Sequence, residues 1–195
     1  MIPASANLTG ALWMVAAMAG FAVEDMFLKA AAKHMPLGQV LLVFGLIGAA
    51  AFALLASRKG ERVFHPAALS RPLFIRSGFE VTGRLFYSLA IALTPLSVAS
   101  AILQATPLVV VAGAAVIFGE TVGWRRWLAI LIGFAGVLVI LRPGLDGFNA
   151  LSLLTILGLI GFAGRDLATR AAPPVLSNLQ LGIYGLSMLA VAGAI

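Results

Sequence analysis

The sequence has no cysteine and very little charge. The missing cysteine excludes disulfide bonds, thiolate metal ligands and cysteine nucleophiles. Only 10% of the 195 residues are charged, while 62% are hydrophobic. A water-soluble domain of this size needs a charged surface, and this chain has too little charge to make one. We therefore expect its apolar surface to face the hydrocarbon of a lipid bilayer.

The apolar residues fall into seven segments long enough to span a membrane, which takes about 20 residues. None of them alternates between polar and apolar residues as the strands of a membrane barrel do. A helix also satisfies its own backbone hydrogen bonds in lipid. We expect an all-α fold, a polytopic bundle of transmembrane helices over residues 8–28, 37–56, 72–93, 95–118, 124–141, 150–170 and 178–195.

The net charge of +6 does not indicate a nucleic-acid partner, because the basic residues lie in the short connectors between apolar segments. Membrane proteins carry their excess of Lys and Arg in cytoplasmic connectors. If each segment crosses once, most of the connector charge lies on the side of the N-terminus, at Arg58, Lys59, Arg62, Arg71, Arg125 and Arg126. We expect a multi-pass protein of the cytoplasmic membrane with a cytoplasmic N-terminus.

Two segments carry similar sequences 141 residues apart. Residues 20–31 read GFAVEDMFLKAA, and residues 161–172 read GFAGRDLATRAA. Each copy has an aspartate, Asp25 or Asp166, with a cation four residues later. Five crossings separate the copies, so the second enters the membrane from the opposite face, as in the inverted repeats of many secondary transporters.

The repeat predicts two domains of like sequence. The first covers residues 8–141 and has five helices, and the second begins at 150–195 with two helices. Two five-helix repeats contain ten helices, so we expect the chain to be truncated by about three. Asp25 and Asp166 are expected near opposite membrane faces.

Several further stretches resemble a known family. They are YSLAIALTPLSVASAI at 87–102, TPL at 106–108, FGE at 118–120, RRWL at 125–128 and GFAGVLVI at 133–140. Together they are similar to the EamA-type branch of the drug/metabolite transporter superfamily. The resemblance implies ten helices in two EamA repeats and the movement of small metabolites or drugs across the cytoplasmic membrane. It brings no catalytic signature and no cofactor.

The third apolar segment contains Arg76, Glu80 and Arg84 at four-residue spacing, which puts all three on one face of a helix. Charges at membrane depth are costly and usually face a cavity or a partner. In one interpretation Arg84 binds an anionic group of a substrate, and Glu80 binds a cation or exchanges a proton. In the other, Glu80 and Arg84 neutralise each other within the helix.

Other segments add further candidates for a pathway lining. Glu24 and Asp25 lie in the first segment and Asp166 in the sixth, and the spacing allows Asp25–Lys29 and Asp166–Arg170 pairs. Such charges either line the pathway or are solvated at the interface. Gln104 shares a helical face with Ser97 and Ser100, and these residues either line a pathway or bond to neighbouring helices.

Proline and glycine mark two features of the helices. Pro107 removes one backbone donor and frees the carbonyl of Leu103, which indicates a flexing point. Small-residue spacings allow helices to approach closely at Gly45–Gly48, Gly133–Gly136 and Gly158–Gly161–Gly164.

The favoured function is a secondary transporter that exposes a central site to each face in turn, with the bilayer and a small-molecule substrate as partners. The sequence leaves self-association into a homo-oligomer open. One alternative is a non-transporting membrane subunit or scaffold, and another is a membrane-embedded enzyme acting on lipid. An enzyme is not expected, because no catalytic arrangement and no metal-binding spacing is found.

Overall fold

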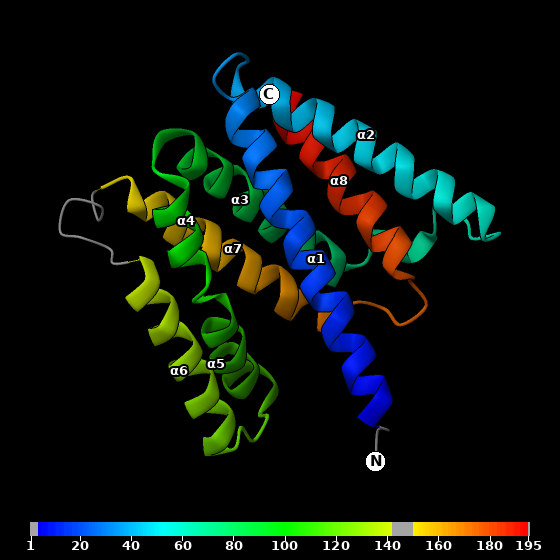
Figure 1. Ribbon diagram of the computed structural model, residues 1–195. Helices are drawn as coiled ribbons and strands as arrows, with labels where there is room; N and C mark the ends of the chain where they lie inside the picture. The colour runs from blue at the N-terminus through cyan, green and yellow to red at the C-terminus, as the bar shows by residue number, and fades with distance from the viewer. Residues whose placement is uncertain (1–3, 142–149, 195) are drawn as a thin grey trace.

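The all-helical prediction is confirmed by the computed structural model, which describes residues 4–141 and 150–194 (Figure 1). The helices are α1 (Ala4–Ala31), α2 (Leu37–Arg58), α3 (Arg71–Leu93), α4 (Leu96–Leu103), α5 (Thr106–Phe118), α6 (Trp124–Leu141), α7 (Ser152–Arg170) and α8 (Asn178–Ala194), with a short 3-10 helix, η1 (Pro66–Leu69). The predicted break at Arg142–Gly144 and the terminal Ile195 lie outside the described residues.

Four stretches within the described residues are long and apolar enough to cross a membrane. They are Leu8–Ala31, Leu37–Arg58, Leu96–Phe118 and Ser152–Arg170. α3 has 23 residues, which also suffices for the roughly 30 Å hydrocarbon core at about 1.5 Å per residue, but it carries the charged series that begins at Arg76. The chain is a multi-pass membrane protein.

The predicted span 95–118 is broken in its middle. α4 ends at Leu103 and α5 begins at Thr106, so Gln104 and Ala105 separate two half-helices. The break lies where the sequence predicted a flexing point. Pro107 has no N–H to donate to the Leu103 carbonyl. The Thr106 hydroxyl donates to that carbonyl instead, at 2.5 Å.

α3 and α7 form one antiparallel pair at the centre of the bundle, and their backbones touch. A Cβ placed on Gly161 of α7 would lie 2.3 Å from the amide nitrogen of Gly83 of α3. Gly158 meets Tyr87, and Gly164 meets the ring of Phe79. The small-residue face predicted for residues 158–164 is therefore a helix-packing face.

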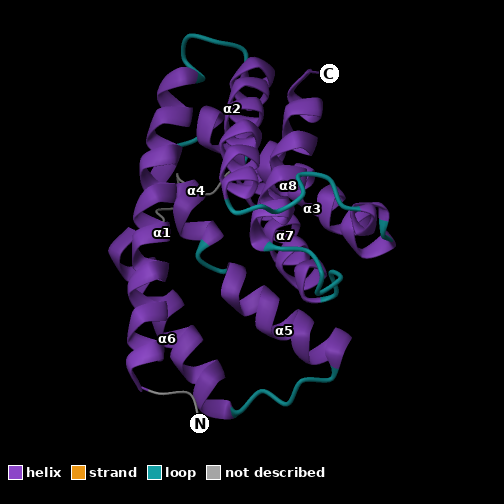
Figure 2. Ribbon diagram, turned by 90° about the vertical axis from the view of Figure 1, so that its right-hand side faces the viewer, coloured by secondary structure: helices purple, strands orange, loops and turns teal. Residues whose placement is uncertain are grey.

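α2 and α8 form the second antiparallel pair and lie side by side in both views (Figures 1 and 2). Gly45 packs on the backbone of α8 at Leu186 and Ala190, and Gly48 meets the Leu186 side chain. The packing role of the Gly45–Gly48 spacing is thus confirmed. The packing predicted for Gly133–Gly136 is wrong for the described residues, since nothing lies within 4 Å of a Cβ placed on either glycine.

The α2–α8 contacts follow the 141-residue offset. Leu186 lies 141 positions after Gly45, so a position contacts its own repeat equivalent. Phe52 packs on Gly182, and Leu41 packs on Gly193. Adding 141 to position 52 gives 193, and subtracting 141 from position 182 gives 41. The offset therefore converts the Phe52–Gly182 contact into the Leu41–Gly193 contact. Contacts that exchange in this way are expected of segments related by a two-fold axis.

α1 stands apart from these pairs. It runs parallel to α3 and contacts it through its second half, while residues 8–23 are exposed. α5 and α6 project from the other side of α7 (Figure 1). The charged face of α3 therefore lies between α1 on one side and α7 on the other.

Candidate functional site

The face of α3 that carries Arg76, Glu80 and Arg84 is turned into the bundle. Arg76 and Arg84 are buried and Glu80 is half-buried. Helical spacing predicted one common face, and the structure agrees. The three side chains nevertheless have partners on different helices: Arg76 and Glu80 bond residues of α7, and Arg84 bonds Glu24 of α1.

The α3–α7 cluster consists of Arg76, Glu80, Arg165, Asp166 and Thr169. Glu80 pairs with two guanidinium groups: Oε2 lies 3.3 Å from Nη2 of Arg76, and Oε1 lies 3.3 Å from Nη1 of Arg165. Arg165 also pairs with Asp166, at 2.8 Å between Nη2 and Oδ1. Nε of Arg76 donates to the Thr169 hydroxyl at 3.0 Å. Two cations and two carboxylates balance in this cluster.

The α1–α3 cluster consists of Glu24, Asp25, Lys29, Arg84 and Tyr87. Nη1 of Arg84 donates to Oε1 of Glu24, and the Tyr87 hydroxyl donates to Oδ2 of Asp25 at 2.9 Å. Nζ of Lys29 donates to the backbone carbonyls of Ile91 and Thr94 at the end of α3, at 2.8 and 2.7 Å. A cation at a helix C-terminus is favourable because the last carbonyls lack intrahelical partners.

Phe162 of α7 lies between the two clusters. Its ring centroid is 5.9 Å from Cζ of Arg84 and 5.1 Å from Cζ of Arg165. The ring of Phe44, from α2, lies 5.2 Å from Cζ of Arg84. These distances allow cation–π attraction, so both guanidinium groups rest on aromatic rings. Nε of Arg84 has no hydrogen-bond partner among the described residues.

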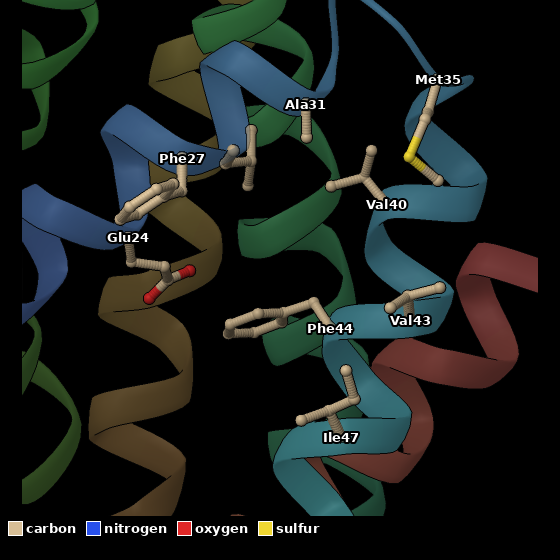
Figure 3. Close-up of a pocket in the computed structure, with 9 residues that line it drawn as sticks. Glu24, Phe27, Ala31, Met35, Val40, Val43, Phe44 and Ile47 are labelled. Carbon is tan, nitrogen blue, oxygen red and sulfur yellow. The ribbon is translucent and has the colours of Figure 1, made fainter.

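A groove of about 410 Å³ opens between α1 and α2, beside the α1–α3 cluster (Figure 3). Its volume lies in the range of roughly 300–1,000 Å³ that is usual for small-molecule sites. Glu24 is the one ionisable residue of its lining, and the remaining lining is apolar: Phe27, Leu28, Ala31, Met35, Val40, Val43, Phe44 and Ile47.

A second cavity, of about 310 Å³, lies at the break between α4 and α5. Gln104, Pro107, Ile130, Gly133 and Phe134 line it. Gln104 is exposed there and lies apart from both charged clusters, as does the exposed Ser97. The structure thus separates Gln104 from the other candidate residues.

Asp25 and Asp166 lie on opposite sides of the middle of α3. Asp25 is level with Tyr87, in the second half of that helix, and Asp166 neighbours Arg165, which reaches Glu80 in the first half. α1 runs parallel to α3 and α7 antiparallel to it, so the two aspartate-bearing helices run in opposite directions.

Three within-helix ion pairs that the spacing allowed are wrong: Glu80–Arg84, Asp25–Lys29 and Asp166–Arg170. Glu80 pairs with Arg76 of its own helix and with Arg165 of α7, and the partner of Arg84 is Glu24. Asp25 accepts from Tyr87, and Lys29 donates to backbone carbonyls of α3. Asp166 pairs with Arg165, and Arg170 pairs with Glu120 at 2.6 Å. Contacts with neighbouring helices outcompete local spacing because those helices approach closely.

Sequence reasoning missed the two residues that connect α3 to α7 and α1. Arg165 lies beside Asp166 in an apolar helix. A charged side chain at membrane depth usually has a functional partner, and this could have identified Arg165 as a candidate. Tyr87 lies three residues after Arg84, on the same helical face, but nothing in the sequence marks it as a partner of Asp25. No group of three His, Asp or Glu side chains in the described ranges is placed to hold a metal ion.

Comparison with known proteins identifies relatives of this chain. It is 28% identical over 176 residues to a riboflavin transporter of Rhizobium johnstonii, covering 86% of this chain and 56% of that protein. It is 29% identical over 102 residues to an S-adenosylmethionine uptake transporter of Rickettsia prowazekii, covering 52% and 35%. It is 27% identical over 169 residues to a pseudopaline exporter of Pseudomonas aeruginosa, covering 83% and 57%.

The chain thus spans about half the length of the relatives it matches, or less. No solved structure gives a significant match. The EamA-like transporter family matches residues 8–142, which is more than half of the chain. The buried charges, the apolar helices and this match agree, and the chain belongs to the EamA-like transporter family.

Proposed function

We propose that this chain forms the pathway of a secondary transporter that moves small metabolites or drugs across the cytoplasmic membrane by alternating access. Residues 8–141 form its first EamA repeat, and 150–195 belong to the second. The N-terminus is cytoplasmic. Glu24, Asp25, Glu80, Arg84 and Asp166 line the pathway, and Gln104 lines it at the break between α4 and α5.

The observation that carries the proposal is the α3–α7 cluster, which crosses the boundary between the two repeats. Glu80 of the first repeat holds Arg165 of the second at 3.3 Å, and Arg76 holds Thr169 at 3.0 Å. Ion pairs at membrane depth usually mark substrate or ion pathways. A site between repeats near the midplane is the arrangement that alternating access requires.

Rocking of one repeat against the other needs contacts that can exchange. Glu80 already forms ion pairs with two guanidinium groups, so a shift of α7 can break its pair with Arg165 and leave it paired with Arg76. The half-helices α4 and α5 supply a flexing point beside α7. The network would have two arrangements, one with Glu80 paired to Arg165 and one without that pair. Switching between them would couple the opening of one membrane face to the closing of the other.

The alternatives receive less support. The family and the named relatives are transporters, which favours transport over lipid chemistry. In the α1–α3 cluster both carboxylates are engaged, Glu24 by Arg84 and Asp25 by Tyr87, and neither is paired with a second carboxyl for acid–base work.

A flux assay tests the proposal. The complete reading frame is reconstituted in liposomes or expressed in cells that lack their own uptake system. Riboflavin and S-adenosylmethionine are the first substrates to try, followed by a metabolite library. Glu80→Gln and Arg84→Gln should each lower the flux at least about tenfold per molecule of protein inserted in the membrane. The exposed pair Glu120–Arg170 supplies the control, because Glu120→Gln makes the same chemical change outside the bundle. Unchanged flux in Glu80→Gln and Arg84→Gln would remove both residues from the pathway.

A further inference from the structure

The groove between α1 and α2 combines an apolar wall with one carboxylate. In Figure 3 the Glu24 side chain and the Phe44 ring project from opposite helices toward the space between them. Arg84 engages Oε1 of Glu24, which leaves Oε2 to accept from a second donor. An apolar pocket with a single polar anchor is the usual design of a small-molecule site.

Glu24 is the charged group on the wall of this groove. Arg84 contacts Glu24, and the neighbouring Asp25 accepts from the Tyr87 hydroxyl. The ammonium group of Lys29 donates to the carbonyls of Ile91 and Thr94 at the end of α3. A ligand in the groove therefore has a carboxylate as its charged contact, and a carboxylate in a low-dielectric region favours a cationic partner.

We propose that the groove binds an organic cation with a flat apolar body. The positive group sits against Glu24, and the body lies along the faces of Phe27 and Phe44. Aromatic rings attract cations through their quadrupole, so the two phenylalanines serve both parts of such a ligand. This inference rests on the proposed function, since it names the substrate class of the same site.

An anion does not fit the same groove. It would lie against the Glu24 carboxylate, and like charges repel strongly where water is scarce. Arg84 is already paired with that carboxylate through Nη1, and the rings of Phe44 and Phe162 lie 5.2 and 5.9 Å from its Cζ. This differs from the sequence-based interpretation, in which Arg84 binds an anionic substrate group.

Arg84 then competes with the ligand for Glu24. When a cation enters the groove, the carboxylate is shared between the ligand and the guanidinium. Removing the guanidinium should therefore strengthen cation binding, whereas an anion site built on Arg84 would lose its ligand. The sign of this effect separates the two kinds of site.

The test is an equilibrium binding measurement on the purified chain in lipid nanodiscs, with empty nanodiscs subtracted. The probes are trimethylphenylammonium and benzenesulfonate, which have similar size and opposite charge. We expect saturable binding of the cation and none of the anion. Glu24→Gln should weaken cation binding about tenfold or more. Arg84→Gln should strengthen it, and Glu120→Gln should leave it unchanged.

A second variant fills the groove without changing its charge. Ala31→Trp should abolish cation binding, while circular dichroism and the thermal midpoint report that the chain still folds. Preference for benzenesulfonate, or cation binding that survives both Glu24→Gln and Ala31→Trp, would overturn the inference. A chain that binds the cation as expected but shows no flux for any metabolite would overturn only the proposed function.

Discussion

Gly83 of α3 and Gly161 of α7 meet backbone to backbone, and this contact sets how closely the two central helices approach. A Cβ on Gly161 would lie 2.3 Å from the Gly83 nitrogen and 2.4 Å from its Cα. The ion pair between Glu80 and Arg165 depends on this contact, because the two side chains meet only while α3 and α7 stay this close.

Adding one methyl group at this contact should separate the helices. We expect Gly161→Ala to lower the free energy of unfolding in detergent by about 1–3 kcal/mol, the usual cost of overpacking. Gly78→Ala is the matched control on α3, since nothing lies within 4 Å of a Cβ there. It should be neutral or stabilising by up to about 1 kcal/mol. Equal effects of the two substitutions would contradict the close contact.

The α3–α7 ion pairs predict an order of effects. Glu80→Gln removes the shared partner of Arg76 and Arg165, while Arg165→Gln leaves Glu80 its bond to Arg76. Removing one side of a buried pair costs about 3–5 kcal/mol, and an exposed pair contributes at most about 1 kcal/mol. In chemical unfolding, Glu80→Gln should be the most destabilising, Arg165→Gln intermediate, and Glu120→Gln near zero. The reverse order for the first two would show that Arg165, not Glu80, holds the cluster together.

The break between α4 and α5 makes Thr106 more important than an ordinary helical threonine. Its hydroxyl donates to the Leu103 carbonyl, whose backbone donor is missing because residue 107 is proline. Thr106→Val should cost about 1 kcal/mol, because it removes the hydroxyl donor of the Leu103 carbonyl at a half-buried position. Thr82→Val is the control: its hydroxyl bonds the Gly78 carbonyl inside a continuous helix, where the backbone already supplies a donor. Thr106→Ser should restore stability.

The absence of cysteine makes the membrane orientation easy to test. Single cysteines at Lys33, between α1 and α2, and at Lys59, after α2, should react from opposite sides of the membrane. With a cytoplasmic N-terminus, an impermeant maleimide added to intact cells labels Lys33→Cys and spares Lys59→Cys. Labelling of both after lysis is the control. Labelling of Lys59→Cys alone in intact cells would reverse the proposed orientation.

The sequence-based predictions succeeded where the physics is local. The low charge and long apolar runs require membrane helices, and the helical period places Arg76, Glu80 and Arg84 on one face. The division into two repeats of opposite direction stays a prediction, with which the offset of the α2–α8 contacts agrees. Pro107 predicted the break that follows Leu103.

The sequence by itself therefore determined which segments are helical, which face of each is small or charged, and where one helix breaks, because these follow from spacing along one chain. Only the tertiary structure decided the partners of the charges. Glu24 lies 60 positions from Arg84 and Glu80 lies 85 from Arg165, so no spacing rule relates them. Their meeting depends on how far each helix is turned and how closely it packs, and those are properties of the folded bundle.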